Sequence, residues 1–373
     1  MKTISIFQKL TLLCVMGLIS FSLNAQTIIT IDNNPGSLTT YQSIQAAHDA
    51  ATSGDIIYVQ PSVTSYGNLT LTKPLTIVGR SHSEPDKRSE IGTVSVRTSG
   101  VTLEGLYTSS ISTSTSSTPN TPPFVGLNIT ECSTSSITIG SSSFSSTPII
   151  DDVLIRGNVI RSSLNIRKDA INVIVSNNIL LSNLETYITN SIAITNNVFK
   201  FTSSTTIENN TASGILNLHN NMFIINTSGT SSSFAKIYLR DGFFNLSNNL
   251  TYNYGTGNDP EFVGFSGGSF TETATLANTD PLFTDVNPAD SDSFAGSSTY
   301  NPGARLADDL TLQASSPALT GGGGSTEIGL YGNSFIYDVL GNPKGYPLLD
   351  VLTYDGAVPK NGNINVNIKA VAK

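Results

Sequence analysis

Tryptophan is absent from this chain, and its 373 residues contain only two cysteines and three histidines. Charged residues make up 12% and aromatic residues 8% of the sequence, which disfavours a helical enzyme and is typical of polar β-structure rich in Ser, Thr, Asn and Gly. The formal net charge of −8 disfavours a nucleic-acid-binding protein. Beyond the N-terminus no apolar run approaches the ~20 residues that a membrane-spanning helix needs, so we expect no membrane span.

The first 25 residues have the pattern of a secretory signal peptide. Two lysines precede an apolar run over residues 10–19, and Leu23-Asn24-Ala25 supplies a cleavage site that ends in a small residue. A lipoprotein anchor on Cys14 is disfavoured because apolar residues continue beyond it. Removal of the leader would change the net charge from −8 to −10, since it carries two lysines and no acid. Cys132 would then be the only cysteine, so no intrachain disulfide forms and we expect an inert, buried thiol.

A short phrase recurs between about residues 136 and 252: apolar, any, apolar, two positions, Asn, one position, apolar. A sixth copy, Ile137, Ile139, Ser142 and Phe144, has Ser in the Asn place. First positions of successive copies are 16 to 28 residues apart, which is the range of solenoid repeats. The copies with Asn are Val153-Ile155-Asn158-Ile160, Val173-Val175-Asn178-Leu180, Ile192-Ile194-Asn197-Phe199, Leu216-Leu218-Asn221-Phe223 and Phe244-Leu246-Asn249-Thr251.

Such a repeat predicts a coil of short parallel strands, each paired with its equivalent one turn away at about 4.8 Å. Equivalent side chains would then stack in columns, with the apolar columns forming a continuous core. The asparagines would stack as an amide ladder, bonding one another or the backbone of the bend and tolerating its tight conformation. We therefore assign a structural role to Asn158, Asn178, Asn197, Asn221 and Asn249.

Both ends of the repeat region carry phrases of their own. Residues 41–51 have helical spacing, with Thr40 as the expected N-cap and Gly54 as the expected stop. The N-terminal strings resemble the cap and first coil of pectin-lyase-like right-handed parallel β-helix proteins: Tyr41-Gln42-Ser43-Ile44-Gln45-Ala46-Ala47, Gly54-Asp55-Ile56-Ile57-Tyr58-Val59 and Lys73-Pro74-Leu75-Thr76-Ile77-Val78-Gly79. The far end resembles the closing coils of secreted bacterial β-helix repeat proteins: Asp280-Pro281-Leu282-Phe283, Leu310-Thr311-Leu312-Gln313, Ser315-Ser316-Pro317-Ala318-Leu319 and Ile328-Gly329-Leu330-Tyr331-Gly332.

The resemblance implies an all-β fold, a single-stranded right-handed parallel β-helix (solenoid) with a short N-terminal capping helix and a C-terminal β cap. We expect a signal peptide at 1–25, the β-helix domain at 26–332, and a C-terminal cap or the start of an appended β-module at 333–373. Residues 107–123, rich in Ser, Thr and Pro, are expected to form a protruding loop. Proteins of this fold include lyases, hydrolases, adhesins and structural proteins, so the fold does not assign an activity.

Motifs of the enzymes with this fold are incomplete in this chain. A lyase-type calcium site needs acids in one outward column of successive rungs. The Asp151-Asp152 pair lacks the other motifs of polygalacturonase-like hydrolases in their order, and paired acids alone do not establish hydrolysis. We expect no metal and no cofactor. Neither of two expected outward columns has acids on successive rungs. The first column consists of Arg156, Ser176, Thr195, His219 and Ser247, and the second of Asp152, Asn172 and Ser191.

The strongest candidate surface is the strip of residues 234–240. Ala235, Ile237 and Leu239 alternate with Phe234, Lys236, Tyr238 and Arg240, so one face would enter the core and the other would present two cations and two aromatics. A second strand would place Arg167 outward beside Lys168. On a shared face these residues could hold an acidic glycan, with Tyr238 under a sugar ring and Lys236 or Arg240 on a carboxylate or sulfate. A solvated strand face is the alternative, and a catalytic pair of Lys236 as base and Arg240 as neutraliser is a weaker one.

Two hypotheses follow from the sequence. The first is a secreted or cell-surface β-helix repeat protein, monomeric and noncatalytic, that binds polysaccharide or serves as a surface or adhesion scaffold. The alternative is a polysaccharide lyase or glycoside hydrolase that acts on acidic polysaccharide through an atypical site.

Overall fold

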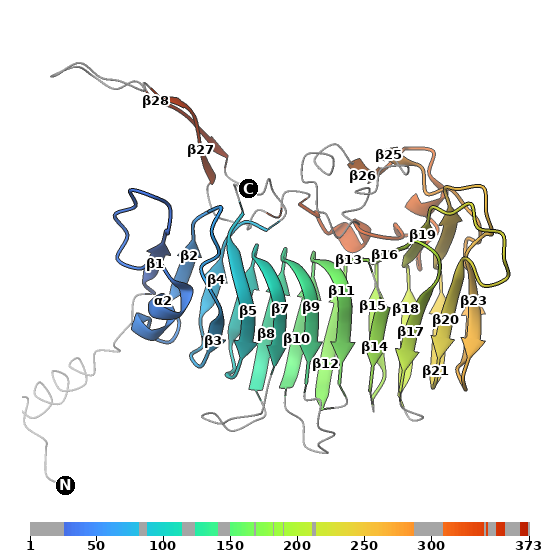
Figure 1. Cartoon of the computed structure of the whole chain (residues 1–373). Coiled ribbons are helices and arrows are strands. Elements are labelled where there is room, and N and C mark those ends of the chain that lie inside the picture. Colours follow the sequence, from blue (N-terminus) through green and yellow to red (C-terminus); the bar gives the residue numbers. More distant parts are fainter. Residues whose placement is uncertain are drawn as a thin grey trace, which may run out of the picture.

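The computed structural model describes residues 26–81, 88–113, 124–140, 150–167, 169–181, 183–188, 190–210, 214–286, 309–338 and 341, and the backbone of residues 348–354 and 366–371. It is nearly all β-structure, and its strands form two long parallel sheets that are compatible with a β-helix solenoid (Figure 1). None of its described helices is long and apolar enough to cross a membrane.

The first sheet has eleven parallel strands that follow one another along the molecule, each paired with the equivalent strand of the next turn (Figure 1). Because alternate residues of each strand point to opposite faces, the register sets Val153 against Val173 and Ile155 against Val175 on the buried face. The strands, in spatial order, are β1 (Ile28–Ile31), β2 (Ile56–Val59), β4 (Thr76–Val78), β6 (Val101–Glu104), β8 (Phe124–Thr130), β10 (Ile150–Arg156), β12 (Ala170–Ser176), β15 (Ile192–Thr195), β18 (Ile215–His219), β21 (Phe243–Ser247) and β24 (Ser269–Thr273).

The second sheet has thirteen strands and divides at β11 (Val159–Ile166), where the register shifts between Ile160 and Ser163. Its undivided part is β3 (Leu69–Leu71), β5 (Glu90–Val96), β7 (Tyr107–Thr113), β9 (Ser133–Ile139) and β11. One branch continues as β13 (Ile179–Leu180), β16 (Val198–Phe201), β19 (Met222–Ile225) and β22 (Leu250–Asn253). The other branch, called here the outer branch, is β14 (Asn183–Thr186), β17 (Thr205–Asn209), β20 (Lys236–Arg240) and β23 (Glu261–Phe265).

Two sequence expectations change at this level. The expected loop over 107–123 begins with a regular strand, β7, paired with β5 and β9, and residues 114–123 lie outside the described residues. The expected sixth repeat copy was wrong, because Ile137 and Ile139 belong to the second sheet and pair with Leu164 and Ile166. The copy that precedes Val153 in the first sheet is instead Leu127, Ile129 and Cys132. Since alternating apolar pairs occur on all sheets, their sequence pattern does not say which sheet a strand joins.

The bend between the two sheets is made by the residue before each ladder asparagine. Gly157 (φ 72°), Asn177 (φ 56°) and Asn196 (φ 58°) have left-handed backbone, and Asn220 and Asn248 repeat it. Glycine and asparagine tolerate this region best, which explains the repeated Asn-Asn pairs. The ladder asparagines therefore do not take the tight conformation themselves, contrary to the expectation from the sequence.

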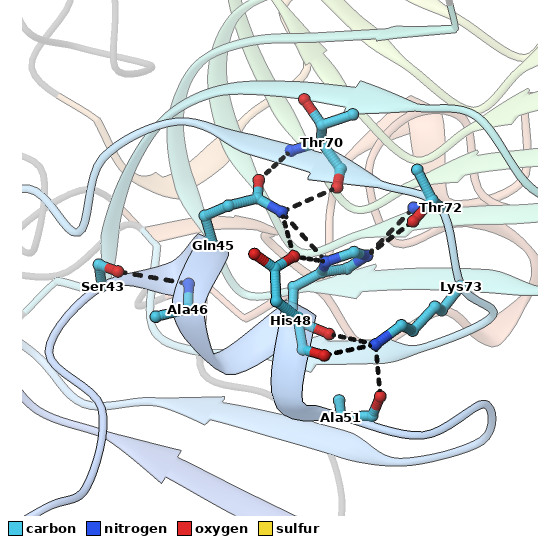
Figure 2. A network of polar contacts seen from close by, with 9 residues as sticks. Ser43, Gln45, Ala46, His48, Ala51, Thr70, Thr72 and Lys73 are labelled. Atoms are coloured by element: carbon cyan, nitrogen blue, oxygen red, sulfur yellow. Dashed lines mark hydrogen bonds and ion pairs between the residues drawn. The ribbon is translucent and has the colours of Figure 1, made fainter. Parts of the chain in front are cut away.

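A short helix, α2 (Ile44–Ala50), lies at the N-terminal end of the coil (Figures 1 and 2). Its N-cap is Ser43, whose hydroxyl accepts the backbone N–H of Ala46 at 3.3 Å, so the expected cap at Thr40 was wrong. The Lys73 ammonium donates to the carbonyl oxygens of His48, Asp49 and Ala51 at 3.0, 2.8 and 2.7 Å (Figure 2). These contacts satisfy carbonyls that the end of a helix leaves open.

The expected closing coils add no strand to either long sheet. Residues 283–285 and 309–312 form a separate antiparallel pair, β25 (Phe283–Asp285) and β26 (Asp309–Leu312), followed by short 3₁₀ turns at Pro317–Leu319 and Gly332–Ser334. The chain then runs back across the bends of the first branch, where Leu310, Ala318, Ile328, Leu330 and Tyr337 bury a second apolar cluster against Val159, Ile179, Val198, Met222 and Leu250. A two-stranded antiparallel sheet of β27 (Leu348–Tyr354) and β28 (Val366–Val371) completes the described chain. The domain boundaries proposed from the sequence stay a prediction.

The left-handed asparagines hold this returning segment, called here the strap (residues 309–338). The Asn177 side-chain amide donates to the carbonyls of Leu330 and Gly332 at 3.0 and 2.9 Å. Asn196 donates to the carbonyl of Glu327 at 3.2 Å and accepts from Asn333 at 2.9 Å. The second asparagine column therefore binds the strap, a role that only contacts between residues far apart in the sequence reveal.

Candidate functional site

The two strips proposed from the sequence lie on one face of the molecule. Arg167 follows β11, and Lys236, Tyr238 and Arg240 lie on β20, which belongs to the outer branch that continues from β11. The register links β11 to β20 through one column of outward residues, Asn165, Glu185, Glu208 and Arg240. Lys168 lies outside the described residues.

Phe234 does not take part in the alternation of this strip. The strand begins at Lys236, and the preceding Ala235 has left-handed backbone (φ 59°). The half-buried Phe234 ring packs close to Gly229: a Cβ atom added to Gly229 would lie 2.5 Å from Cδ1 of the ring. Phe234 therefore packs against the neighbouring loop, and the outward aromatic contribution of β20 is Tyr238.

Each described cation of the strip has a carboxylate partner. The Lys236 ammonium pairs with the carboxylate of Glu261 on β23. Arg240 Nε lies 3.7 Å from Glu208 Oε1 and 3.8 Å from Asp241 Oδ2. The sequence analysis missed Glu261 and Glu208 because they come from neighbouring turns, 25 and 32 residues away from their cations, and these acids make the face mixed in charge rather than basic.

Arg167 is part of a tighter cluster with Glu185 and Tyr187. Its guanidinium lies 4.5 Å from the centroid of the Tyr187 ring, and Nη1 lies 3.5 Å from Glu185 Oε1. The Tyr187 hydroxyl donates to the same Oε1 at 2.6 Å. This hydrogen bond, together with burial, raises the pKa of Tyr187, so the phenol stays protonated at neutral pH. The cluster is built to hold its own residues in place rather than to supply a base.

Aromatic rings lie at the other end of the strip. Tyr238 of β20 and Phe265 of β23 have ring centroids 5.2 Å apart with a tilt of 55°. Phe265 is one of the few large apolar side chains that are exposed, at 51%. The exposed apolar ring of Phe265 and the phenol of Tyr238 together favour contact with ligands that combine apolar and hydroxyl-bearing surfaces.

The outward residues Arg156, Ser176, Thr195, His219 and Ser247 stack in one column as expected, and in register this column continues through Thr130 to Glu104. The Arg156 guanidinium donates to Ser176 Oγ at 3.0 Å, and Thr195 follows in register. His219 pairs with the hydroxyl of Ser247, and partial burial lowers its pKa. Among the described residues, no group of three or more His, Cys, Asp or Glu side chains is placed to hold a metal ion.

The ladder asparagines are fully buried and form a continuous chain of hydrogen bonds. In each step from Asn158 to Asn249, the side-chain oxygen of one asparagine accepts both the backbone N–H and the side-chain amide of the preceding one, at 2.9 to 3.3 Å. Cys132 occupies the next place, and its backbone N–H donates to Asn158 Oδ1 at 2.9 Å. Burial raises the pKa of the Cys132 thiol to about 12, so it is not a nucleophile at neutral pH.

No protein-family model matches this chain, and no curated protein matches it. Function is therefore inferred from the geometry of the outer branch and of the bends beside it.

Proposed function

We propose that this protein is an exported, noncatalytic right-handed parallel β-helix of the pectin-lyase-like type that binds polysaccharide along the outer branch. The parallel register of both long sheets supports the β-helix, as does the resemblance of the N-terminal strings that form α2, β2 and β4. The secretory pattern of residues 1–25 supports export. An elongated face of stacked polar residues suits an elongated ligand.

The proposal that the protein binds polysaccharide without cleaving it rests on the ion pairs of the strip. A lysine acts as a general base only in its neutral form, and a neighbouring carboxylate favours the charged form. The carboxylate of Glu261 pairs with the Lys236 side-chain nitrogen, and the carboxylates of Glu208 and Asp241 lie beside the Arg240 guanidinium. A lyase needs both a free base and a free positive group, whereas Lys236 and Arg240 are each paired with a carboxylate.

The same pairs bear on the choice of ligand. An acidic sugar would have to displace Glu261 or Glu208 from its cation, whereas a neutral sugar could contact Tyr238 and Phe265 and leave both pairs intact. Exposed ion pairs contribute little energy, so displacement costs little but also gains little. We therefore propose that neutral chains bind at least as well as acidic ones, which revises the acidic ligand expected from the sequence.

Affinity electrophoresis in gels that contain neutral or uronate polysaccharides tests binding, and the same mixtures are assayed for unsaturated and new reducing ends. We expect retardation by neutral chains without release of either product. Tyr238→Ala combined with Phe265→Ala should abolish retardation, while the control Phe243→Ala, an exposed ring on the first sheet, should leave it unchanged. Release of product would overturn the noncatalytic role and favour the lyase or hydrolase alternative. Migration unaffected by every polysaccharide would overturn the binding proposal.

A further inference from the structure

A cavity of about 320 Å³ opens beside the first sheet, between the first half of β12 and a wall formed by Ile188 and residues 190–193. This volume is near the small end of the range of ligand pockets, which is about 300–1,000 Å³. Ile188, on its wall, directly follows Tyr187 of the Arg167 cluster in the sequence. The cavity therefore adjoins the end of the outer branch, at the connection that leads back to the first sheet.

A change in the coil backbone creates this space. In four successive turns a left-handed residue directly precedes the first buried apolar column of the first sheet, at Gly100, Gly126, Asp152 and Asn172, but the next turn has no left-handed residue at the equivalent Ser191. β12 is seven residues long and pairs fully with β10, whereas its pairing with β15 begins only at Ile174. Residues 170–173 consequently face the cavity where the other turns face a neighbouring strand.

The wall opposite β12 is supported from behind by Gly214. A Cβ atom at this position would lie 2.4 Å from the carbonyl oxygen of Ile188 and 3.0 Å from that of Asn190. The backbone of the next turn thus packs directly against Ile188 and Asn190, so this wall cannot shift away from β12 without moving that turn as well.

The lining combines an apolar floor with a polar rim. Ile174 is 52% exposed and lies beside Ile188 and Ile192, which are buried beneath the surface. The rim offers a carboxylate, two amides and a hydroxyl, from Asp152, Asn172, Asn190 and Ser191. The Asn172 amide also donates to Asp151 Oδ1 at 2.7 Å, which brings a second carboxylate to the edge.

This chemistry selects an uncharged ligand rich in hydroxyl groups. Sugar hydroxyls both donate and accept, so they match a rim of carboxylate, amide and hydroxyl groups, and the C–H face of a ring can rest on the isoleucines. None of the described residues that line the cavity is basic, so a uronate or sulfate would meet Asp152 without a cation to neutralise it. We propose that this cavity is a subsite for one neutral hexose unit of the bound polysaccharide. This subsite rests on the proposed function, and it places a specificity-determining contact away from Tyr238 and Phe265.

Two variants test the subsite with glucose-, mannose- and galactose-based neutral hexasaccharides and hexagalacturonate, measured by isothermal titration calorimetry. Ala193→Trp places a bulky ring in the cavity mouth from an exposed position and should weaken binding of the preferred neutral hexasaccharide at least about tenfold. Asp152→Asn keeps a residue that tolerates left-handed backbone but removes the charge, and should narrow the preference for neutral over acidic ligand. Thr271→Trp is the matched control, because Thr271 is exposed in the same outward column three strands away.

The outcomes separate this inference from the proposed function. If a neutral hexasaccharide binds and Ala193→Trp binds it as tightly as Thr271→Trp does, the subsite is refuted while polysaccharide binding stands. If Ala193→Trp weakens binding but loss of Tyr238 and Phe265 does not, the subsite stands and the outer branch is refuted. Preference of the unaltered protein for hexagalacturonate would overturn the neutral ligand, and absence of binding by all four probes would overturn both.

Discussion

Replacement of Asn197 in the middle of the ladder by alanine tests whether the asparagine column holds the coil together. The Asn197 side chain is fully buried, and its oxygen accepts the backbone N–H and the side-chain amide of Asn178, both at 2.9 Å. Its amide donates to Asn221 Oδ1 and Thr195 O, each at 3.0 Å, and to Val175 O at 3.3 Å. Alanine removes five contacts and leaves the buried backbone N–H of Asn178 without an acceptor, whereas the Asn178 side-chain amide keeps the carbonyls of Ile155 and Ser176.

A buried donor left without a partner costs about 1–3 kcal/mol, and each of the other lost hydrogen bonds costs about 0.5–1.5 kcal/mol, so we expect Asn197→Ala to lower the free energy of unfolding by about 3–5 kcal/mol. That is a large part of the 5–15 kcal/mol that stabilises a typical domain. The loss is measured from the midpoint and slope of urea unfolding, followed by circular dichroism.

The control is Asn245→Ala on the outward face of the first sheet. Asn245 also bonds to its neighbours in the column, Asn217 and Thr271, at 3.2 and 3.1 Å, but it is only half-buried. Water can replace these bonds, so we expect a loss of about 1 kcal/mol or less. Equal losses for Asn197→Ala and Asn245→Ala would refute the reasoning. The double variant Asn178→Ala with Asn197→Ala should cost less than the sum of the single variants, because each single variant already breaks the bonds that link the pair.

Three further predictions concern the two ends of the coil. Lys73→Met should lower the free energy of unfolding by about 1–3 kcal/mol, because three helix carbonyls lose a charged donor; an unchanged urea midpoint would contradict this. Hydrogen bonds from Thr52 and Thr27 lower the pKa of Asp55 from its ordinary value of 3.8. The stability that the Asp55 carboxylate contributes is therefore present above pH 3.8 and is lost as the pH falls through its lowered pKa. Thermal melts between pH 2 and 6 should show this loss of stability for the unaltered protein and not for Asp55→Asn. Glu272 lies on β24, the last strand of the first sheet, opposite the buried Leu246, and it keeps that edge of the sheet charged. Glu272→Leu, unlike Glu272→Gln, should therefore cause concentration-dependent association in sedimentation velocity. An unchanged sedimentation coefficient for Glu272→Leu would contradict this.

The candidate strip shows what a sequence pattern can predict about a surface. Alternation was sufficient to predict that Lys236, Tyr238 and Arg240 point away from Ile237 and Leu239, because side chains alternate along any strand. It could not predict Glu261 or Glu208, since their distance from the cations depends on the length of each intervening loop. These loops decide the charge of the face, and with it the class of ligand that we propose.

The cavity and the strap were beyond the sequence for a related reason. Asn172 and Ser191 are equivalent in the repeat, yet only Asn172 has left-handed backbone, and the opening beside β12 follows from that difference. Likewise, Ile328 and Leu330 read as one more coil, but they cover the apolar side of the first branch instead. Alternation of apolar residues in a sequence predicts that they are buried, but it does not predict which part of the protein covers them.

The sequence by itself determined the strands that carry the Asn-marked phrase and the place of each ladder asparagine, because these depend on spacing within one turn, which the chain repeats. Tertiary structure alone decided which sheet each pair of apolar residues joined, which acids neutralise the cations, and where the strap returns. Those outcomes depend on contacts between residues 20 to 153 positions apart, whose register is set by loops that carry no repeat.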